Sequence, residues 1–373
     1  MQGGVEDQSL TPEDQLFVLL QAGPNLTATR GHSAPEARAC YERAEALCQA
    51  LNRPLDLYVA LLGKWHYFLL TEKLSVIMQV AKRLYSVAKE QNDSAQMIAA
   101  YRALAATHHF LGDFESARKY AIRGIEIWRS RSAESHVEDL DASGVVCLCY
   151  KSLSEWHFGE IASADANIAE AISLANELHD THALAGALHF AAILSHLRRN
   201  DAELERLVSD LIELSTRHHF ALWLAAGEIF GGWARSVSGR TAEGIAWIED
   251  GIRDYRGAGS MLRMPCYLAL KAEALHLANR TSEALEVIKE AEAVVERFEE
   301  RGWSAELHRL RGVFLAAAGA DDAQIETSFR EAISAATQQK SVSLMKRAEA
   351  TYAEYRRQKV SQSGGRGFQL PLC

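Results

Sequence analysis

Apolar residues recur at helical spacing along most of this chain, in runs that end at Gly or Asn. In the clearest unit, Leu268, Ala272 and Leu275 fall at i, i+4 and i+7, so they share one helix face. A second helix follows, in which Ala284 and Ala291 lie seven apart and again share a face. Small residues on both helices allow the two to approach closely. The pattern predicts a helical hairpin.

The same hairpin repeats along the chain. Its turns are marked by Gly or Asn, the residue types that most readily adopt the left-handed backbone at a helix C-terminus. The turn residues are Gly112, Gly159, Asn200, Gly239, Asn279 and Gly319. They recur at intervals of about 40 residues, a period that indicates an α-solenoid.

We therefore predict an all-α fold, a tetratricopeptide-like α-solenoid of about seven helical hairpins in a right-handed superhelix, over residues 14–357. HEAT-like pairs are the rival architecture, because the period exceeds the roughly 34 residues of a standard tetratricopeptide repeat. The small residues around each turn favour the tetratricopeptide type. Residues 1–13 are expected to be disordered, 358–373 to form a flexible tail, and the polar stretch 129–143 to form an enlarged loop.

Composition narrows the function classes. The net charge of −9 argues against nucleic acid as the main partner. Cys147 and Cys149 lie in an apolar run, which is typical of buried free thiols rather than a metal pair. The N-terminus does not resemble a signal peptide, and the uncharged span 181–197 is short for a bilayer. We expect a cytoplasmic protein with no membrane partner.

The usual catalytic motifs are absent from the sequence. It contains no G-x-x-x-x-G-K-[ST], H-E-x-x-H or G-x-S-x-G. His182, His189 and His196 form a stripe with a spacing of seven, but two helical turns separate neighbours by roughly 10 Å, too far to share one metal ion. We predict no catalytic, cofactor or metal site.

A binding groove can be projected from the repeat frame. The first helix of each hairpin should line the concave face, and its groove-facing positions mix aromatic and charged side chains. These positions are His66, Arg102, His109, Trp156, Phe190, Trp233, Glu273 and Arg309. Such a line suits a peptide or ligand groove. The alternative is that the tryptophans simply pack between repeats. The two arginines are expected to be solvated.

Four stretches carry a family resemblance. They are GPNLTATRGHSAPEARACYERAEALCQAL (23–51), SEWHFGEIASADA (154–166), LWLAAGEIFGGWARSVSGRTAEGI (222–245) and SAELHRLRGVFLA (304–316). Over about residues 14–357 the chain resembles the C-terminal repeat region of bacterial STAND-type predicted ATPases that are often fused to an adenylate/guanylate cyclase domain. The stretches are repeat positions rather than catalytic motifs, and the ATP-binding lysine and metal-binding aspartates of that family have no counterpart.

The resemblance implies a detached regulatory or sensor region of a bacterial signalling protein, without its enzymatic activity. The first expectation is a non-catalytic interaction protein that binds a protein or peptide in its groove. A small-molecule inducer sensor is the alternative: an elongated charged and aromatic groove favours peptide, and a closed apolar pocket favours a small ligand. Part of a cyclase or ATPase is the third hypothesis, against which the missing motifs argue.

Overall fold

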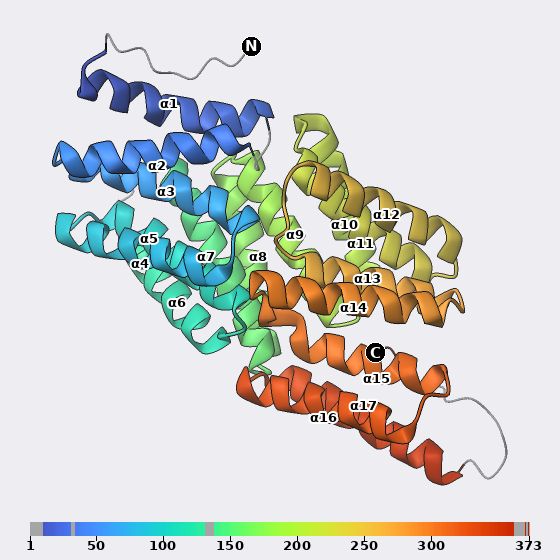
Figure 1. Cartoon of the computed structure of the whole chain (residues 1–373). Helices are drawn as coiled ribbons and strands as arrows, with labels where there is room; N and C mark the ends of the chain where they lie inside the picture. Colours follow the sequence, from blue (N-terminus) through green and yellow to red (C-terminus); the bar gives the residue numbers. More distant parts are fainter. Residues whose placement is uncertain (1–9, 31–33, 131–137, 362–369, 371, 373) are drawn as a thin grey trace.

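The computed structural model describes residues 10–30, 34–130, 138–361, 370 and 372. These residues form seventeen α-helices and one 3-10 turn and contain no β-strand, as the sequence predicts. Successive helices run antiparallel and pair along the chain, so the fold is an α-solenoid of eight hairpins followed by a last helix (Figure 1). The predicted number was about seven.

The first helices of the hairpins are the odd-numbered ones. They are α1 (Pro12–Arg30), α3 (Pro54–Thr71), α5 (Ser94–Phe110), α7 (Glu138–His157), α9 (Thr181–Leu197), α11 (Ala221–Val237), α13 (Met264–Leu277), α15 (Ser304–Ala317) and the unpaired α17 (Val342–Ser361). Most of them contact both the preceding and the following odd helix, so they form the inner layer. In α9 every residue from Ala185 to Leu197 is buried.

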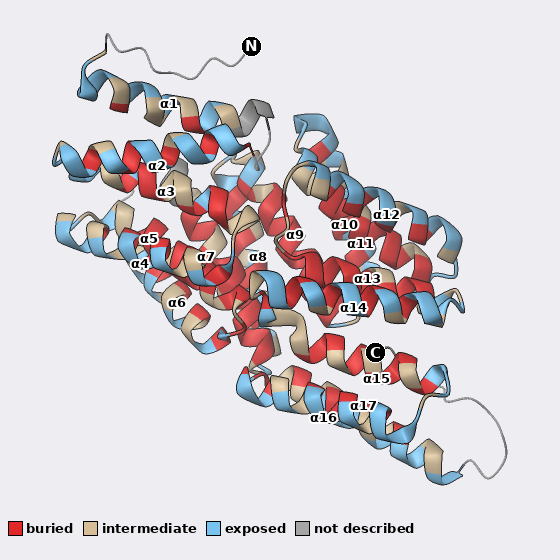
Figure 2. Ribbon diagram, in the orientation of Figure 1, coloured by how far each residue is buried: buried red, intermediate tan, exposed pale blue. Residues whose placement is uncertain are grey.

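The second helices form the outer layer. They are α2 (Pro35–Ala50), α4 (Leu74–Gln91), α6 (Phe114–Ser130), α8 (Ile161–Glu177), α10 (Asp201–His218), α12 (Thr241–Gly257), α14 (Thr281–Phe298) and α16 (Asp322–Gln338). Each buries one stripe, as Leu74, Ile77, Ala81, Leu84 and Ala88 do in α4. Figure 2 shows the contrast: α9 and α13 are largely buried, whereas α10, α12 and α14 expose one side.

The left-handed turns are confirmed at five of the six predicted positions. Gly112, Gly159, Gly239, Asn279 and Gly319 all have positive φ. The sixth position differs.

At the turn between α9 and α10, Asn200 has φ −97° and acts as the N-cap of α10, where its side chain accepts a hydrogen bond from the backbone N–H of Glu203. The left-handed residue is Arg199, with φ +55°. The sequence therefore placed the turn one residue too late, because Asn suits both an N-cap and a left-handed position.

Small residues set the spacing of the hairpins, as predicted. Ala284 is fully buried. The helices α11 and α12 are in contact through Gly232 and Gly244, where a Cβ added to Gly232 would lie 2.5 Å from the carbonyl oxygen of Gly244. Only glycine permits this approach of two backbones.

The superhelix closes on itself, so its concave face becomes interior. The backbone N–H of Met261, before α13, donates to the carbonyl of Leu70 in α3 at 2.9 Å. The Ser343 hydroxyl of α17 donates to the Trp156 carbonyl of α7 at 2.5 Å. His157 Nδ1, at the end of α7, lies 2.8 Å from the hydroxyl oxygen of Ser341, just before α17. The first and second halves of the chain thus meet along a seam.

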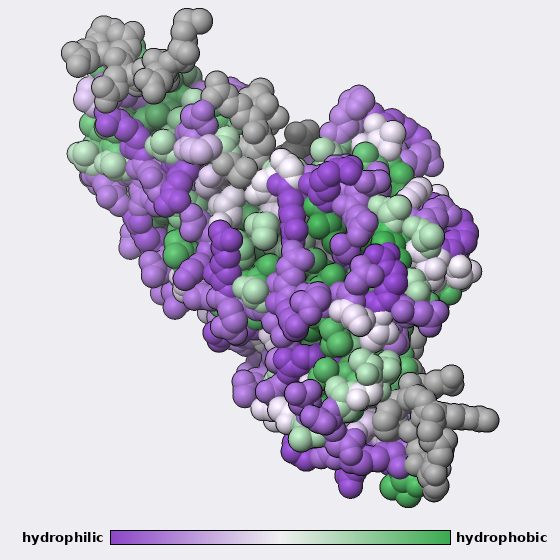
Figure 3. Space-filling view, turned by 45° about the vertical axis from the view of Figure 1, so that its right-hand side comes forward, coloured by the Kyte–Doolittle hydropathy of each residue, from purple (hydrophilic) through white to green (hydrophobic). Residues whose placement is uncertain are grey.

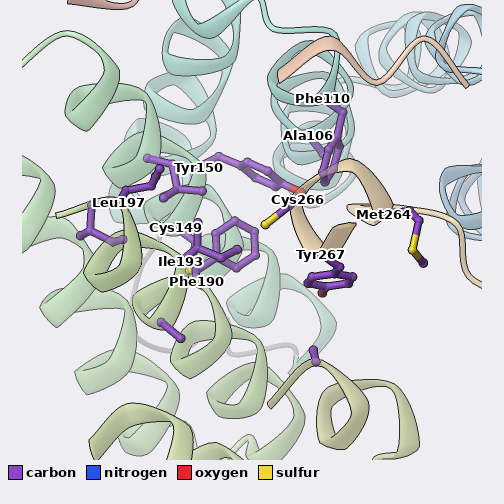
Figure 4. Close-up of a cluster of buried hydrophobic side chains, with 14 of the residues drawn as sticks. Ala106, Phe110, Cys149, Tyr150, Phe190, Ile193, Leu197, Met264, Cys266 and Tyr267 are labelled. Atoms are coloured by element: carbon purple, nitrogen blue, oxygen red, sulfur yellow. The ribbon is translucent and has the colours of Figure 1, made fainter. Parts of the chain in front are cut away.

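Aromatic and aliphatic side chains fill this seam. Figure 4 shows Phe110 from α5, Tyr150 from α7, Phe190 from α9, and Cys266 and Tyr267 from α13 gathered in one cluster. Tyr150 and Phe190 meet edge-on, with ring centroids 5.0 Å apart. The contacts between residues far apart in sequence explain why nearly all the buried residues form one continuous core.

The helical array is slightly longer than predicted. α1 begins at Pro12 rather than residue 14, and α17 continues to Ser361 rather than stopping at residue 357. The predicted polar loop 129–143 is wrong at its end, because α7 begins at Glu138. Residues 131–137 and most of the predicted disordered segment (1–9) and flexible tail (362–369, 371, 373) lie outside the described residues.

The surface of the array is mainly hydrophilic. On the face shown in Figure 3, hydrophobic residues gather only in small separate patches between charged and polar ones. Within the part of the chain that the structure describes, no helix is both long and apolar enough to cross a bilayer.

Candidate functional site

The eight projected groove residues all lie on odd-numbered helices, but most of them are not open to solvent. His66 is exposed and Arg102 is half-buried. The other six are buried: His109, Trp156, Phe190, Trp233, Glu273 and Arg309. The expectation that Arg309 is solvated is wrong, because closure of the superhelix covers the middle of the concave face. The eight residues fall into three separate groups.

The first group is the pair at the edge of the array. Arg102 Nη2 lies 2.6 Å from His66 Nε2, and the Arg102 guanidinium lies over the Trp65 ring at 5.5 Å from its centroid. Residues on adjacent odd helices, α3 and α5, supply the two side chains.

The second group lies in the seam around Arg263. The Arg263 guanidinium lies over the rings of Phe110 and Phe190, at 4.9 and 4.6 Å from the two centroids. His109 is also buried here, and burial, followed by the nearby Arg263 charge, lowers its pKa to about 3. These contacts favour structural packing over ligand binding for His109 and Phe190.

Glu300 completes the seam. Its Oε2 accepts a hydrogen bond from the backbone N–H of Arg263 at 2.9 Å, and its side chain is buried. Burial raises the pKa of this carboxyl to about 8, although Arg263 opposes the rise. Glu300 is therefore protonated near neutral pH, which is how a buried carboxyl avoids an uncompensated charge.

The third group is an ionic network, here called the inner cluster: Arg199, Glu273, Glu306, Arg309 and Arg347. Arg199 Nη1 lies 2.9 Å from Glu273 Oε2, and its Nη2 lies 3.6 Å from Glu306 Oε1. Arg309 binds Glu306 with two hydrogen bonds, of 3.0 and 2.8 Å. Arg347 Nη1 lies 3.4 Å from the same Glu306 oxygen.

Both projected tryptophans frame this cluster. Trp233 Nε1 donates to Glu273 Oε2 at 3.1 Å, and the Arg199 guanidinium lies over its ring at 5.3 Å. The Arg347 guanidinium lies over the ring of Trp156 at 5.5 Å. The tryptophans are thus buried, as the packing alternative held, but they also hold the arginines in place through cation–π contacts.

In the inner cluster, the neighbouring arginines keep the buried Glu306 carboxylate ionised. Burial alone would raise the pKa of Glu306, but the charges of Arg309, Arg347 and Arg199 outweigh it and hold that pKa well below its usual range. Burial lowers the pKa of Arg347, against the attraction of Glu306. Three guanidinium groups and two carboxylates give these five side chains a net charge of +1, so an anionic group nearby is favoured.

A peptide segment already contacts the inner cluster. The main-chain carbonyl oxygen of Leu372 accepts hydrogen bonds from Arg199 Nη2 at 2.9 Å and from Arg309 Nη2 at 2.8 Å. Leu370 is buried in the main core, and Leu372 packs against it. Two guanidinium groups, from turns and helices 110 positions apart in sequence, thus converge on one backbone carbonyl.

Sequence reasoning found four residues of this arrangement and missed the rest. The projected residues Trp156, Trp233, Glu273 and Arg309 all lie here. Arg199 was missed because its turn was assigned to Asn200, and Arg347 because it belongs to a last helix that lacks a Gly or Asn turn. Glu306 could have been identified from the sequence as a partner of Arg309, because it lies three residues earlier on the same helix face.

Room for a small ligand is scarce beside the cluster. A cavity between the seam and the cluster is lined by His109, His157, Arg263, Glu300, Trp303 and Glu306, among others. Its volume is about 20 Å³, which holds one or two water molecules. Among the described residues, no group of three His, Cys, Asp or Glu side chains could hold a metal ion.

Comparisons with known proteins agree on the architecture. No family model matches the chain. An uncharacterized protein of Rhizobium meliloti (strain 1021) is 27% identical over 352 residues, which cover 91% of this chain and 33% of that protein. The chain therefore spans about a third of the length of the curated relative it matches.

Solved structures of Rap proteins share the fold. A Rap protein complexed with competence and sporulation factor is 10% identical, with a TM-score of 0.57 over 93% of this chain and 99% of that one. The Rap conjugation gene regulator of the plasmid pLS20, in complex with the Phr* peptide, is 11% identical, with a TM-score of 0.52 over 95% and 98% of the two chains. At these identities the likeness shows a shared helical repeat fold.

Proposed function

We propose that this chain is a non-catalytic peptide-recognition module whose ligand lies on the inner face of the superhelix, against the inner cluster. The observation that carries the proposal is the convergence of Arg199 and Arg309 on the carbonyl oxygen of Leu372. Recognition of a main-chain carbonyl is independent of side-chain identity, so it suits a site for extended peptides.

The Rap structures support this function by analogy. Two of them were solved with competence and sporulation factor or with the Phr* peptide bound. They share with this chain a helical repeat array over nearly its full length. The analogy is at the level of fold, so the contacts of the inner cluster remain the physical argument.

The charge of the inner cluster indicates which class of peptide would bind. Its excess of one positive charge favours a peptide that brings a carboxylate close to the bound carbonyl, from a C-terminus or an acidic side chain.

We further propose that the module works as the sensing region of a longer bacterial signalling protein of the ATPase–cyclase type. The match to about a third of a longer relative supports this, together with the resemblance of the repeat stretches. The chain itself is expected neither to hydrolyse ATP nor to form a cyclic nucleotide. A cytoplasmic location fits this role, because the ligand and the downstream enzyme would share one compartment.

A small-molecule sensor is less well supported. Small-ligand sites usually enclose about 300–1,000 Å³. The cavity beside the inner cluster has about 20 Å³, far below that range. An extended peptide, by contrast, needs a line of contacts along the inner face rather than an enclosed space.

The test is a selection of random heptapeptides with free C-termini on the immobilised full chain, followed by fluorescence anisotropy with individual peptides. Selected peptides should bind Arg199→Gln at least about tenfold more weakly than the parent, since a charge-assisted hydrogen bond contributes about 1.5–3 kcal/mol. Arg217→Gln is the matched control, because Arg217 pairs with Glu213 on the exposed side of α10, and both side chains are more than 60% exposed. Peptides whose affinity does not change in Arg199→Gln would place the binding site elsewhere.

A further inference from the structure

We propose that the resident ligand of the inner face is the chain's own tail, and that free peptides with the same pattern, two leucines in alternate positions, compete with it. This inference rests on the proposed peptide-binding function and names the class of peptide. The tail is named here by its two described residues, Leu370 and Leu372.

The tail contacts the site in the manner of a bound peptide. Leu372 presents its main-chain carbonyl to Arg199 and Arg309, two members of the inner cluster. Arg309 comes from α15, and Arg199 from the turn between α9 and α10, so two elements far apart in the sequence hold the same carbonyl. A contact that merely tied the tail to α17 would involve neither element.

The side chains supply the specificity. Leu370 is 9% exposed, and Leu372 is partly buried against the main core. Both leucines thus pack against the array, while the Leu372 carbonyl between the two guanidinium groups fixes the register. A peptide with polar groups at these two positions would have to bury them, which costs free energy.

Occupation by the tail makes the site self-inhibited. A tethered segment competes at an effective concentration on the order of millimolar. If the tail alone has a dissociation constant of about 10 µM, a free peptide would bind the parent about a hundredfold more weakly than a chain whose tail is displaced. The tail thus sets a threshold that an external peptide must exceed.

The experiment uses the full chain and a fluorescent synthetic peptide with the sequence of residues 367–373, GFQLPLC, under reducing conditions. The double variant Leu370→Asp/Leu372→Asp should release the tail, because it would bury two carboxylates against the core. Peptide affinity, measured by anisotropy, should rise at least about tenfold over the parent. The peptide with Asp at both leucine positions should not bind either protein.

Val360→Asp is the matched control, since Val360 lies near the end of α17, is 86% exposed and has no buried environment to lose. It should leave the affinity for GFQLPLC at the parental value. Circular dichroism of each variant establishes that the helices are intact.

Two outcomes separate the inference from the function it rests on. If the double variant binds GFQLPLC no better than the parent does, while peptides from the random selection still depend on Arg199, the tail is not the ligand and the peptide-binding function stands. If the affinity of the selected peptides does not depend on Arg199 and GFQLPLC does not bind, both the inference about the tail and the proposed peptide-binding site are wrong. A gain of affinity for GFQLPLC in Val360→Asp as well would also overturn the inference.

Discussion

Arg199 and Glu273 form a buried ion pair, 2.9 Å between Nη1 and Oε2, although the backbone of Arg199 lies in the left-handed region. The other turns between paired helices on the predicted frame place Gly or Asn at this conformation. A residue with a Cβ loses roughly 1–2 kcal/mol there. The cost is offset by the guanidinium, which reaches Glu273 and the Leu372 carbonyl from this turn.

Arg199→Gly should therefore show two opposing effects. It relieves the left-handed backbone but leaves the Glu273 carboxylate buried without this partner, and breaking a buried pair costs about 3–5 kcal/mol. We expect a net loss of about 1–4 kcal/mol in the free energy of unfolding, measured by urea denaturation.

The double variant Arg199→Gly/Glu273→Gln supplies the control for that substitution. A neutral amide in place of the buried carboxylate should recover part of the loss, which a double-mutant cycle quantifies. If Arg199→Gly has the same free energy of unfolding as the parent, the ion pair stabilises the fold by no more than the left-handed backbone costs.

Arg309 offers a direct contrast with surface arginines. Its side chain is fully buried and binds Glu306 through two hydrogen bonds. Arg309→Ala should lower the free energy of unfolding by about 3–5 kcal/mol, because the Glu306 charge remains buried. Arg217→Ala, which breaks an exposed pair with Glu213, should change it by less than about 1 kcal/mol. Similar urea midpoints for the two variants would contradict the buried geometry.

The local repeat could be predicted from the sequence because it depends on residues close together in the chain. The buried Ala284 and the left-handed Gly112 and Asn279 follow from helix periodicity and turn chemistry. The projection also placed Trp233 and Glu273 on one face, and they share a hydrogen bond.

Closure of the superhelix could not be predicted in the same way. It depends on contacts such as Met261 with Leu70 and Ser343 with Trp156, which join residues about 190 positions apart and have no periodic signature. If closure of the superhelix is not known, Arg309 is expected to be a solvated residue of an open groove. The approach of Leu372 to the inner cluster is equally invisible, because a short tail carries no helical pattern.

The close approach of α11 and α12 gives a prediction about packing. A Cβ at Gly232 would lie 2.5 Å from the Gly244 carbonyl oxygen, and a backbone atom cannot move aside as a side chain does. Gly232→Ala should cost at least about 1–3 kcal/mol in the free energy of unfolding. Gly257→Ala is the control, because a Cβ there meets no atom within 4 Å. It should be neutral or stabilise by up to about 1 kcal/mol. Equal thermal midpoints for the two variants would mean that the helices are further apart than described.

Glu300 predicts how stability changes with pH. Burial raises the pKa of its carboxyl from 4.5 to about 8 in the folded chain, against the opposing Arg263. Between these values the folded state holds a proton that the unfolded state has lost, so the free energy of unfolding falls as pH rises through this window. Buried His109, with its pKa lowered to about 3 by burial and Arg263, acts in the opposite direction below pH 6.5.

The Glu300 contribution is therefore measured as the difference between the parent and Glu300→Gln. His109 and the other buried histidines, whose pKa burial lowers, still titrate near pH 6.5 in the unfolded state, but they affect both proteins alike. Glu300→Gln keeps an acceptor for the Arg263 N–H but cannot titrate at this position. From pH 6.5 to 8.0 the free energy of unfolding of the parent should fall by about 1.5–2 kcal/mol relative to that of Glu300→Gln, because one proton contributes at most about 1.4 kcal/mol per pH unit. Glu286→Gln, at a 70% exposed side chain, should keep the parental slope. A Glu300→Gln slope equal to that of the parent would show that Glu300 is already ionised at pH 6.5 and that the seam holds its charge.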